Sequence, residues 1–149
     1  KLSINSLGEL NEEEFEENKH LITNEVDRRR AKHAVYENQR TIKAVKLLEA
    51  GDLQGFGKLM NDSHISLRYD YEVTGRELDT IVELAWQQEG TIGARMTGAG
   101  FGGCTVSIVK NQYLEQFIKA VGEKYEEKIG YEADFYIASV GDGAKELKY

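Results

Sequence analysis

The stretch TIGARMTGAGFGGCTVSIV, Thr91 to Val109, is the part of the sequence on which the fold depends. Two mostly apolar runs, Ile92 to Met96 and Thr105 to Val109, contain the β-branched residues that are typical of strands. Between them lie seven residues, Thr97 to Gly103, four of which are glycine. The pattern predicts a strand, a glycine loop and a second strand. Because glycine has no Cβ and accepts positive φ, we expect another surface to approach this loop closely.

The loop is the first candidate for a binding site, and its residues are Thr97, Gly98, Ala99, Gly100, Phe101, Gly102 and Gly103. Backbone N–H groups in such a loop can form an anion-binding concavity, so phosphate is the first ligand to consider. The letters GAGFGG match GxGxxG, but a strand-like run follows where a dinucleotide fold has a helix, and no GK[ST] ending is present. The alternative is a hairpin connection with a bulge that only turns the chain. Spacing alone leaves both interpretations open.

Composition narrows the class of protein. A chain of 149 residues is long enough for one domain with a real core. Its 19 Lys and Arg against 26 Asp and Glu give a net charge of −7, which argues against nucleic acid or an anionic membrane as partner. The sequence contains neither a secretory signal pattern nor an apolar run of membrane-spanning length, so we expect a cytoplasmic protein. The single cysteine, Cys104, follows the glycine loop, and we expect it in the core.

Apolar residues recur at helical spacing in four segments, and a capping box, Asn11 with Glu14, indicates a further helix before them that carries the acidic run through Glu17. We predict helices from about Asn11 to Glu17, from Asn24 to Gly51, from Asp52 to Leu67, from Leu78 to Gly90 and from Tyr113 to Tyr125. A last strand is predicted over Ala133 to Val140, where apolar Phe135 and Ile137 alternate with their neighbours.

This order of elements predicts an α+β fold with helices on one face of an antiparallel sheet. Strand, strand, helix, strand is the trailing portion of a ferredoxin-like βαββαβ unit, here with additional N-terminal helices. The first strand of such a unit would come from Leu2 to Leu7 or from residues before Lys1. No linker-like stretch divides the chain, so residues 1–149 are expected to form one domain.

Four motifs carry a resemblance to a known family. GARMTGAGFGGC, Gly93 to Cys104, resembles the third conserved motif of galactokinases, within the superfamily of galactose, homoserine, mevalonate and phosphomevalonate kinases. RRRAKHAVYEN, Arg28 to Asn38, is similar to their basic RRxRHxxxE helix, and SHISLRYDYEVT, Ser63 to Thr74, to their SHxSLRxDYEVS segment. VGDGA, Val140 to Ala144, resembles the closing GDG. The motifs stand in family order and cover essentially the whole chain.

The resemblance implies a galactokinase C-terminal domain with a ferredoxin-like core and extra helices. In the family, the glycine loop lies at the cleft between two lobes and helps to close the site over sugar and phosphate. The galactose-binding signature, the serine-rich nucleotide loop and the catalytic aspartate belong to the N-terminal lobe, and no such segment occurs here. The resemblance therefore supplies no catalytic residue and no metal ligand in this chain. Galactose, ATP and Mg²⁺ would be bound through the other lobe, and the chain alone would be catalytically incomplete.

Three interpretations of the parent protein follow from the resemblance. It is a galactokinase, a related kinase acting on N-acetylgalactosamine, or a galactokinase-like sensor that binds galactose and ATP without efficient turnover. Residues of the missing lobe decide among them, so all three stay open. A domain separated from its lobe exposes apolar surface, and we expect that it is able to associate with itself.

Charged residues outside the loop have less specific interpretations. The basic run Arg28 to Arg30 with Lys32 could bind a phosphate, but we favour a structural role, either solvated or paired with Glu25, Glu37 or a neighbouring lobe. Asp70 and Glu72 stand two residues apart and are able to act as acid and base, but we favour a role in ordering their loop.

The three histidines, His20, His33 and His64, are too scattered for a metal-binding pattern. We expect His64 to form hydrogen bonds inside a bundle of helices.

Overall fold

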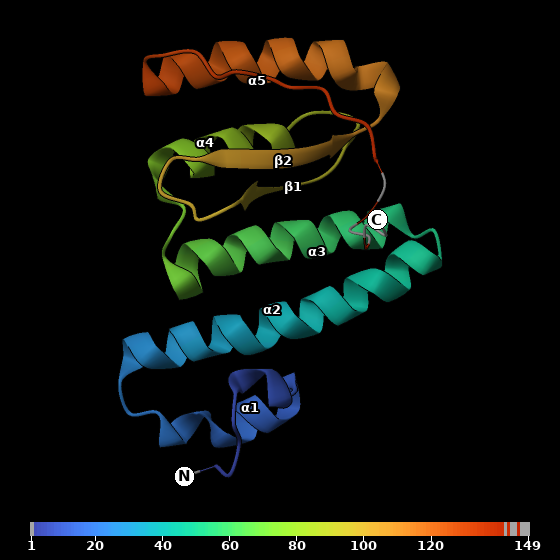
Figure 1. Cartoon of the computed structure of the whole chain (residues 1–149). Coiled ribbons are helices and arrows are strands. Elements are labelled where there is room, and N and C mark those ends of the chain that lie inside the picture. The colour runs from blue at the N-terminus through green and yellow to red at the C-terminus, as the bar shows by residue number, and fades with distance from the viewer. Residues whose placement is uncertain (1, 142, 144–145, 147–149) are drawn as a thin grey trace.

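The computed structural model describes residues 2–141, 143 and 146. Its main elements are α1 (Glu12–Asn18), α2 (Glu25–Glu49), α3 (Leu53–Ser66), α4 (Gly75–Trp86), β1 (Thr91–Thr97), β2 (Cys104–Val109) and α5 (Leu114–Ile129). Short 3-10 turns occur at Leu7–Glu9, Lys19–Leu21 and Asn111–Tyr113, and a π-helical turn extends α3 over Leu67–Tyr71. Figure 1 shows the elements stacked from α1 at one end to α5 at the other, with the β-hairpin between α3 and α5. Within the described residues, no helix combines the length and apolar character needed to cross a bilayer.

Polar side chains start the first three helices where the sequence predicts them. The Asn11 side chain accepts a hydrogen bond from the Glu14 N–H and the Glu14 carboxylate accepts one from the Asn11 N–H, which completes the capping box. Asn24 and Asp52 cap α2 and α3 with their side-chain oxygens. Gly51, at φ 71°, ends α2 in the left-handed conformation that glycine adopts without a steric penalty.

The two strands pair in antiparallel register, from Thr91 opposite Val109 to Thr97 opposite Cys104, with an irregularity between Thr91 and Gly93. Helix α3 runs along β1 so closely that the two backbones touch. A Cβ on Gly93 would lie 2.5 Å from the carbonyl oxygen of Gly57, and a Cβ on Gly57 would overlap the backbone carbonyl of Ile92. This contact therefore requires glycine on both sides.

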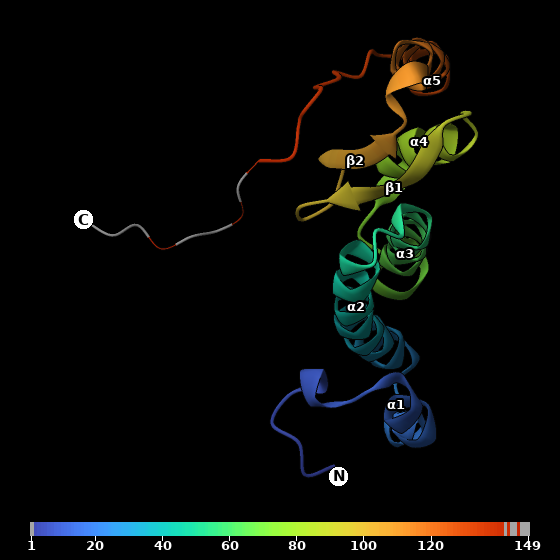
Figure 2. The same cartoon turned by 90° about the vertical axis from the view of Figure 1, so that its right-hand side faces the viewer.

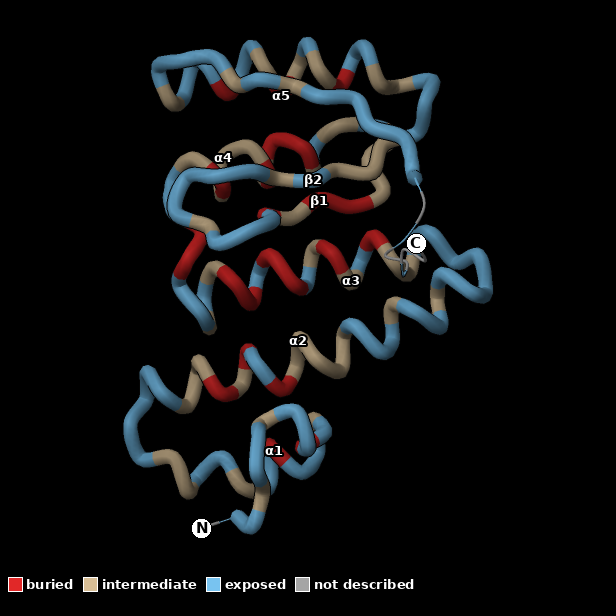
Figure 3. The backbone as a smooth tube through the Cα atoms, in the orientation of Figure 1, coloured by how far each residue is buried: buried red, intermediate tan, exposed pale blue. Residues whose placement is uncertain are grey.

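Buried side chains form three clusters. The largest joins α4, β1 and α5 through Val82, Leu84, Ala85, Ala94, Phe117, Val121 and Tyr125. A second joins the N-terminal segment and α1 to the first half of α2 through Leu10, Phe15, Ala31 and Val35. A third, beside the π-helical turn, consists of Leu67, Val73, Leu78 and Met96. Figure 3 shows buried backbone concentrated in α3, α4 and β1, whereas the second half of α2 is largely exposed.

The predicted last strand is wrong. Residues 132–141 have no regular secondary structure, and Tyr136 and Ile137 are 88% and 72% exposed. Phe135 packs against α5 near Gly122, so this segment runs along the helix (Figure 1) before it leaves the body of the molecule, as Figure 2 shows. Alternation in sequence thus identified an extended segment but not a hydrogen-bonding partner. Asp142 and Ala144 of the closing motif lie outside the described residues.

The described residues therefore form a mixed fold of helices with a small two-stranded antiparallel sheet. The segment Leu2 to Leu7 adds no strand, since it is irregular up to the 3-10 turn at Leu7–Glu9. The expectation for Cys104 is also wrong, because this residue is exposed. Cys104 opens β2 directly after the glycine loop.

Candidate functional site: the glycine loop and its anchor

The loop between β1 and β2 turns the chain through a run of left-handed residues. Gly98, Gly100 and Gly102 have φ values of 76°, 88° and 90°, and Phe101 between the last two has φ 58°. Residues other than glycine rarely adopt this conformation, so Phe101 must be held in it by its surroundings. Its side chain is 79% exposed, which leaves backbone contacts to fix the loop.

One backbone contact anchors the loop to the segment that follows the π-helical turn. The Phe101 N–H donates to the carbonyl oxygen of Val73 at 2.8 Å. A Cβ on Gly100 would overlap this same carbonyl oxygen and would lie 3.3 Å from the Met96 side chain. The close approach expected at the loop therefore exists at Gly100, and the approaching group is a carbonyl of the chain itself.

Side chains of α3 and α4 satisfy the outer edge of β1, the strand that carries the loop. Asn61 Oδ1 accepts a hydrogen bond from the Ala94 N–H at 2.9 Å, and His64 Nδ1 accepts one from the Met96 N–H at 3.1 Å. The Trp86 indole N–H donates to the Ala94 carbonyl at 3.1 Å. Because these backbone groups have partners, β1 is fixed in register and offers no free edge there.

His64 is neutral in this arrangement. It is fully buried, its Nδ1 accepts the Met96 N–H, and its Nε2 therefore carries the proton and faces Asp79 Oδ1 at 3.3 Å. Burial lowers the pKa of His64 even though Asp79 favours the charged form. The expected hydrogen bonding of His64 is present, but its partner is a strand and not another helix.

The basic run of α2 lies along the π-helical turn. Arg29 Nη1 donates to the Tyr69 carbonyl and to Glu72 Oε1, each at 2.9 Å. Arg30 Nη2 donates to Glu72 Oε2 at 2.9 Å, and its Nη1 donates to the Tyr71 carbonyl. These hydrogen bonds, chiefly the one from Arg29, lower the pKa of the Glu72 carboxyl group. Both guanidinium groups therefore have a structural role, as favoured from the sequence, but their acidic partner is Glu72, which was not among the expected partners.

The other cations of the run also have partners within the chain. Arg28 forms an ion pair with Glu25, as the sequence analysis anticipates, and Lys32 Nζ lies 3.2 Å from both carboxylate oxygens of Asp70. The two carboxylates considered as acid and base, Asp70 and Glu72, are thus each paired with a cation. This agrees with a role in ordering the turn.

A serine, a histidine and an aspartate meet between α2 and the π-helical turn, but not as a nucleophilic site. The Ser66 hydroxyl donates to Asp70 Oδ2 at 3.0 Å, so its oxygen accepts from the His33 Nδ1–H at 3.0 Å. Burial lowers the pKa of His33, whose ring stacks on Tyr71 with centroids 4.7 Å apart. Since the Ser66 hydroxyl donates its hydrogen bond to a carboxylate and not to the histidine, these residues connect the two segments.

A cavity of about 420 Å³ adjoins the loop, between α2, α3 and the face of the sheet that carries Arg95 and Val106. Thr97, the first residue of the loop, contributes to its lining. At its charged side, Glu37 Oε1 accepts hydrogen bonds from Arg95 Nη1 at 3.0 Å and from the Ser63 hydroxyl at 2.6 Å. This ion pair links α2 directly to β1.

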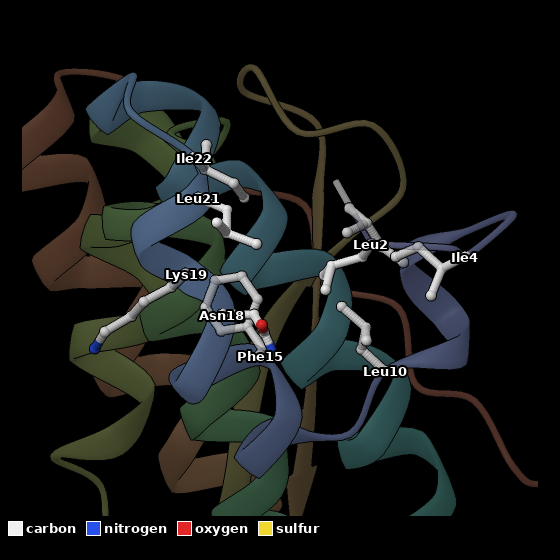
Figure 4. A pocket seen from close by; sticks show the side chains of 9 residues that line it. Leu2, Ile4, Leu10, Phe15, Asn18, Lys19, Leu21 and Ile22 are labelled. Atoms are coloured by element: carbon white, nitrogen blue, oxygen red, sulfur yellow. The ribbon is translucent and has the colours of Figure 1, made fainter.

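A second cavity of about 310 Å³ lies at the α1 end of the molecule, away from the loop. Figure 4 shows Leu2, Ile4 and Leu10 on one side of it and Phe15 and Ile22 on the other. Its lining is almost entirely apolar. It lacks the convergent polar groups that orient a ligand, so we do not place the functional site there.

The described residues do not fit a magnesium site. Among them, no group of three or more His, Cys, Asp or Glu side chains is placed to hold a metal ion. The carboxylates of Glu37, Asp70 and Glu72 are each in an ion pair with Arg or Lys.

Three groups that position the loop were not identified from the sequence. Asn61 and Trp86 satisfy β1, and the pair of Glu37 with Arg95 crosses from α2 to β1. The sequence offered no signal for Asn61, which stands in the predicted helix like any other polar residue.

The chain is similar to known proteins over nearly its whole length. Residues 44–127 match the family described as GHMP kinases C terminal. The chain is 66% identical over 145 residues to a galactokinase of Clostridium acetobutylicum and 61% identical over 147 residues to one of Fusobacterium nucleatum. These alignments cover 97% and 99% of the chain but 37% and 38% of the relatives, so the chain spans little more than a third of their length.

The fold agrees with this similarity. A crystal structure of Lactococcus lactis galactokinase complexed with galactose superposes with a TM-score of 0.92 at 55% sequence identity, covering 98% of this chain and 38% of that one. The glycine loop, the π-helical turn and most of the basic run's partners lie within the matched family segment. The chain belongs to the GHMP kinases, as a member of their C-terminal family.

Proposed function

We propose that residues 1–149 are the C-terminal domain of a galactokinase. The whole protein would transfer the γ-phosphoryl group of ATP to the anomeric hydroxyl of galactose and release galactose 1-phosphate. The observation that carries this proposal is 61–66% identity to galactokinases over nearly the whole chain. The relatives named above are galactokinases, and no observation favours an N-acetylgalactosamine kinase or a sensor.

The glycine loop, Thr97 to Gly103, would line the cleft where sugar and phosphate meet. Its part in the reaction would be to place backbone groups and to exclude water, since it contains no side chain able to transfer a proton at neutral pH. The left-handed run anchored on Val73 supports this role, because it gives the loop a defined shape with few side chains in the way.

Galactose, ATP and Mg²⁺ would be held mainly by the part of the protein outside this chain. In phosphoryl transfer, a metal ion bridges the nucleotide's phosphates and neutralises developing charge, and a carboxylate orients the attacking hydroxyl. The carboxylates near the loop are engaged in ion pairs, so the chain alone would be inactive. The proposal places the protein in the cytoplasm, where ATP and sugar phosphates are used.

The ferredoxin-like arrangement is likewise a proposal for the whole protein. Among the described residues, β2 pairs only with β1, so its other edge is available to a further strand. Occupation of this edge would extend the sheet, and amide hydrogen exchange of β2 would then be slower in the whole protein than in the isolated chain.

The isolated chain is expected to self-associate. Ile42, Val45 and Leu48 are 47%, 52% and 48% exposed on the second half of α2. In the absence of the other lobe, a second copy is able to cover these side chains. Sedimentation velocity over a range of concentrations would detect the association, and Val45→Lys should weaken it.

The experiment that tests the proposed function measures ADP formation by the whole protein with galactose, and assays the 149-residue chain in parallel. Activity that requires galactose and is confined to the whole protein is the expected result. A preference for N-acetylgalactosamine, or binding of galactose and ATP without turnover, would replace the proposal with one of the alternatives. Activity of the short chain would show that Asp70 or Glu72 has a catalytic role.

The role of the loop is tested by Gly100→Val in the whole protein. A side chain at this position would collide with the Val73 carbonyl and disfavour the left-handed backbone, so we expect turnover to fall about 100-fold. Gly8→Ala is the matched control, because a Cβ at Gly8 meets only the Ser6 hydroxyl at 3.6 Å. Unchanged kinetics of Gly100→Val would remove the loop from the proposed site.

A further inference from the structure

Two non-glycine residues with positive φ lie at the hydrogen bond that anchors the loop, one in each of the two segments that it joins. In the described part of the chain, Glu72 and Phe101 are the non-glycine residues with positive φ, at 62° and 58°. Glu72 immediately precedes Val73, whose carbonyl accepts the Phe101 N–H. Strained backbone of this kind persists only where the surroundings hold it, and it is concentrated at functional sites. What holds Glu72 therefore also determines where the loop is anchored.

Two arginines hold Glu72 from α2. Arg29 Nη1 and Arg30 Nη2 bind its two carboxylate oxygens separately, each at 2.9 Å. The same guanidinium groups donate to the carbonyls of Tyr69 and Tyr71, which end the π-helical turn. Cations are well suited to this place, because the last carbonyls of a helix lack backbone donors and carry partial negative charge.

The start of the turn is held from the same helix. Lys32 binds the Asp70 carboxylate, and His33 donates to the Ser66 hydroxyl that itself binds Asp70. The turn is π-helical over Leu67–Tyr71, a conformation that is rare and occurs mostly at functional sites. Helix α2 thus fixes both ends of the turn, although none of its residues in this region is shown to contact the loop itself.

We propose that Glu72 is a positioning residue for the glycine loop: held by Arg29 and Arg30, it fixes the carbonyl of Val73 that anchors Phe101. This proposal rests on the proposed function for its kinetic consequence, but not for its structural one. It assigns a common purpose to three motifs: the basic run and the SLRYDYEV segment pair with each other to hold the GAGFGG loop in place.

The expected energetics separate positioning from stability. The Glu72 side chain is 44% exposed, and ion pairs at such positions contribute little to the free energy of unfolding. A loop anchored by one backbone hydrogen bond, in contrast, moves readily when its acceptor moves. Loss of the Glu72 carboxylate should therefore change the loop and leave the melting temperature nearly unchanged.

The test compares Glu72→Asn with Glu72→Asp in the whole protein. Both side chains tolerate the left-handed conformation and have the same size, so the pair differs in charge. We expect Glu72→Asn to speed amide exchange in a peptide spanning the loop by about tenfold. Its kcat/KM for galactose should fall about tenfold, mainly in kcat, because the ligand-binding groups are unchanged. Glu72→Asp should recover most of both losses.

Glu12→Gln is the control, since it removes another ion pair of α2, that with Lys43 at 2.8 Å, far along the helix from the turn. It should match the unmodified protein in exchange and kinetics. Loop exchange that is unchanged in Glu72→Asn, or equally fast in Glu72→Asn and Glu72→Asp, would overturn the proposal. So would a rise in exchange as large in α5 as in the loop. If the unmodified protein phosphorylates no galactose, the proposed function fails, and the exchange data still decide whether Glu72 positions the loop.

Discussion

The two strands of the hairpin are neighbours with opposite surroundings. In β1, Ala94 and Met96 are 0% and 2% exposed, and α3 and α4 satisfy the outer edge. In β2, no residue is fully buried, Val106 is 44% exposed and Cys104 is exposed. The sequence of both strands is similarly apolar, so the difference comes from the helices beside them. Stability and loop placement should therefore depend on β1 far more than on β2.

The largest effect is expected where α3 touches β1. Gly57→Ala would push a methyl group into the Ile92 carbonyl, and backbone cannot move aside as a flexible side chain can. We expect a loss of about 3 kcal/mol in the free energy of unfolding, measured by urea denaturation. Val106→Ala in β2 is the comparison and should cost under about 1 kcal/mol. Equal losses would mean that the two strands do not differ in this way.

His64 makes the contact between α3 and β1 sensitive to acid. Because its pKa is lowered in the folded chain, the unfolded chain takes up a proton first as the pH falls. The free energy of unfolding should be highest above about pH 6.5 and should decrease below it toward the folded pKa. Asp79, Arg68 and Arg95 are the charged groups that face the ring from α4, the π-helical turn and β1.

Replacement of His64 shows how much of the pH dependence of the free energy of unfolding is due to this residue. His64→Leu leaves the buried Met96 N–H without an acceptor and should cost about 2 kcal/mol at neutral pH. It should also flatten the slope between neutral and mildly acidic pH, with the remainder due to His33, whose pKa is lowered too. An unchanged slope in this variant would assign the acid sensitivity to other groups.

A smaller effect is expected from the indole of Trp86. Trp86→Phe keeps most of the packing but removes the donor to the Ala94 carbonyl, at an expected cost of about 1 kcal/mol. Thermal unfolding monitored by circular dichroism would measure it. No measurable loss would show that this edge of β1 gains nothing from the indole.

The smallest effect is expected at Cys104. Cys104→Ser should change the free energy of unfolding by no more than about 0.5 kcal/mol, because the side chain is exposed. The thiol should react with a chromogenic disulfide reagent in the native chain as fast as in denaturant. Slow reaction in the native chain would instead place this end of β2 under cover.

Local patterns predicted the elements that depend on local chemistry. Asn11, Asn24 and Asp52 cap helices by bonds to residues two or three positions away, so their role is readable in the sequence. The strands at either side of the loop and the need for Gly100 are readable for the same reason. The basic run of α2 is likewise recognisable in the sequence from its consecutive positive charges.

What could not be predicted is which distant groups meet. Nothing near Gly100 in the sequence indicates Val73 as its neighbour, and Asn61 looks like any polar residue of a helix until β1 lies beside it. Cys104 and Ile137 were misplaced because apolar spacing shows that a side chain favours burial but not whether a neighbour is present to bury it.

The hydrogen bonds from α3 to β1 also fix the spacing of residues in the helix relative to the spacing of residues in the strand. Three residues of helix, Asn61 to His64, advance about 4.5 Å, whereas two residues of strand, Ala94 to Met96, advance about 6.6 Å. Asn61 and His64 nevertheless both reach their N–H partners on β1. One residue inserted between them would turn one acceptor away by about 100°. This segment can therefore diverge in its amino acids more readily than in its length.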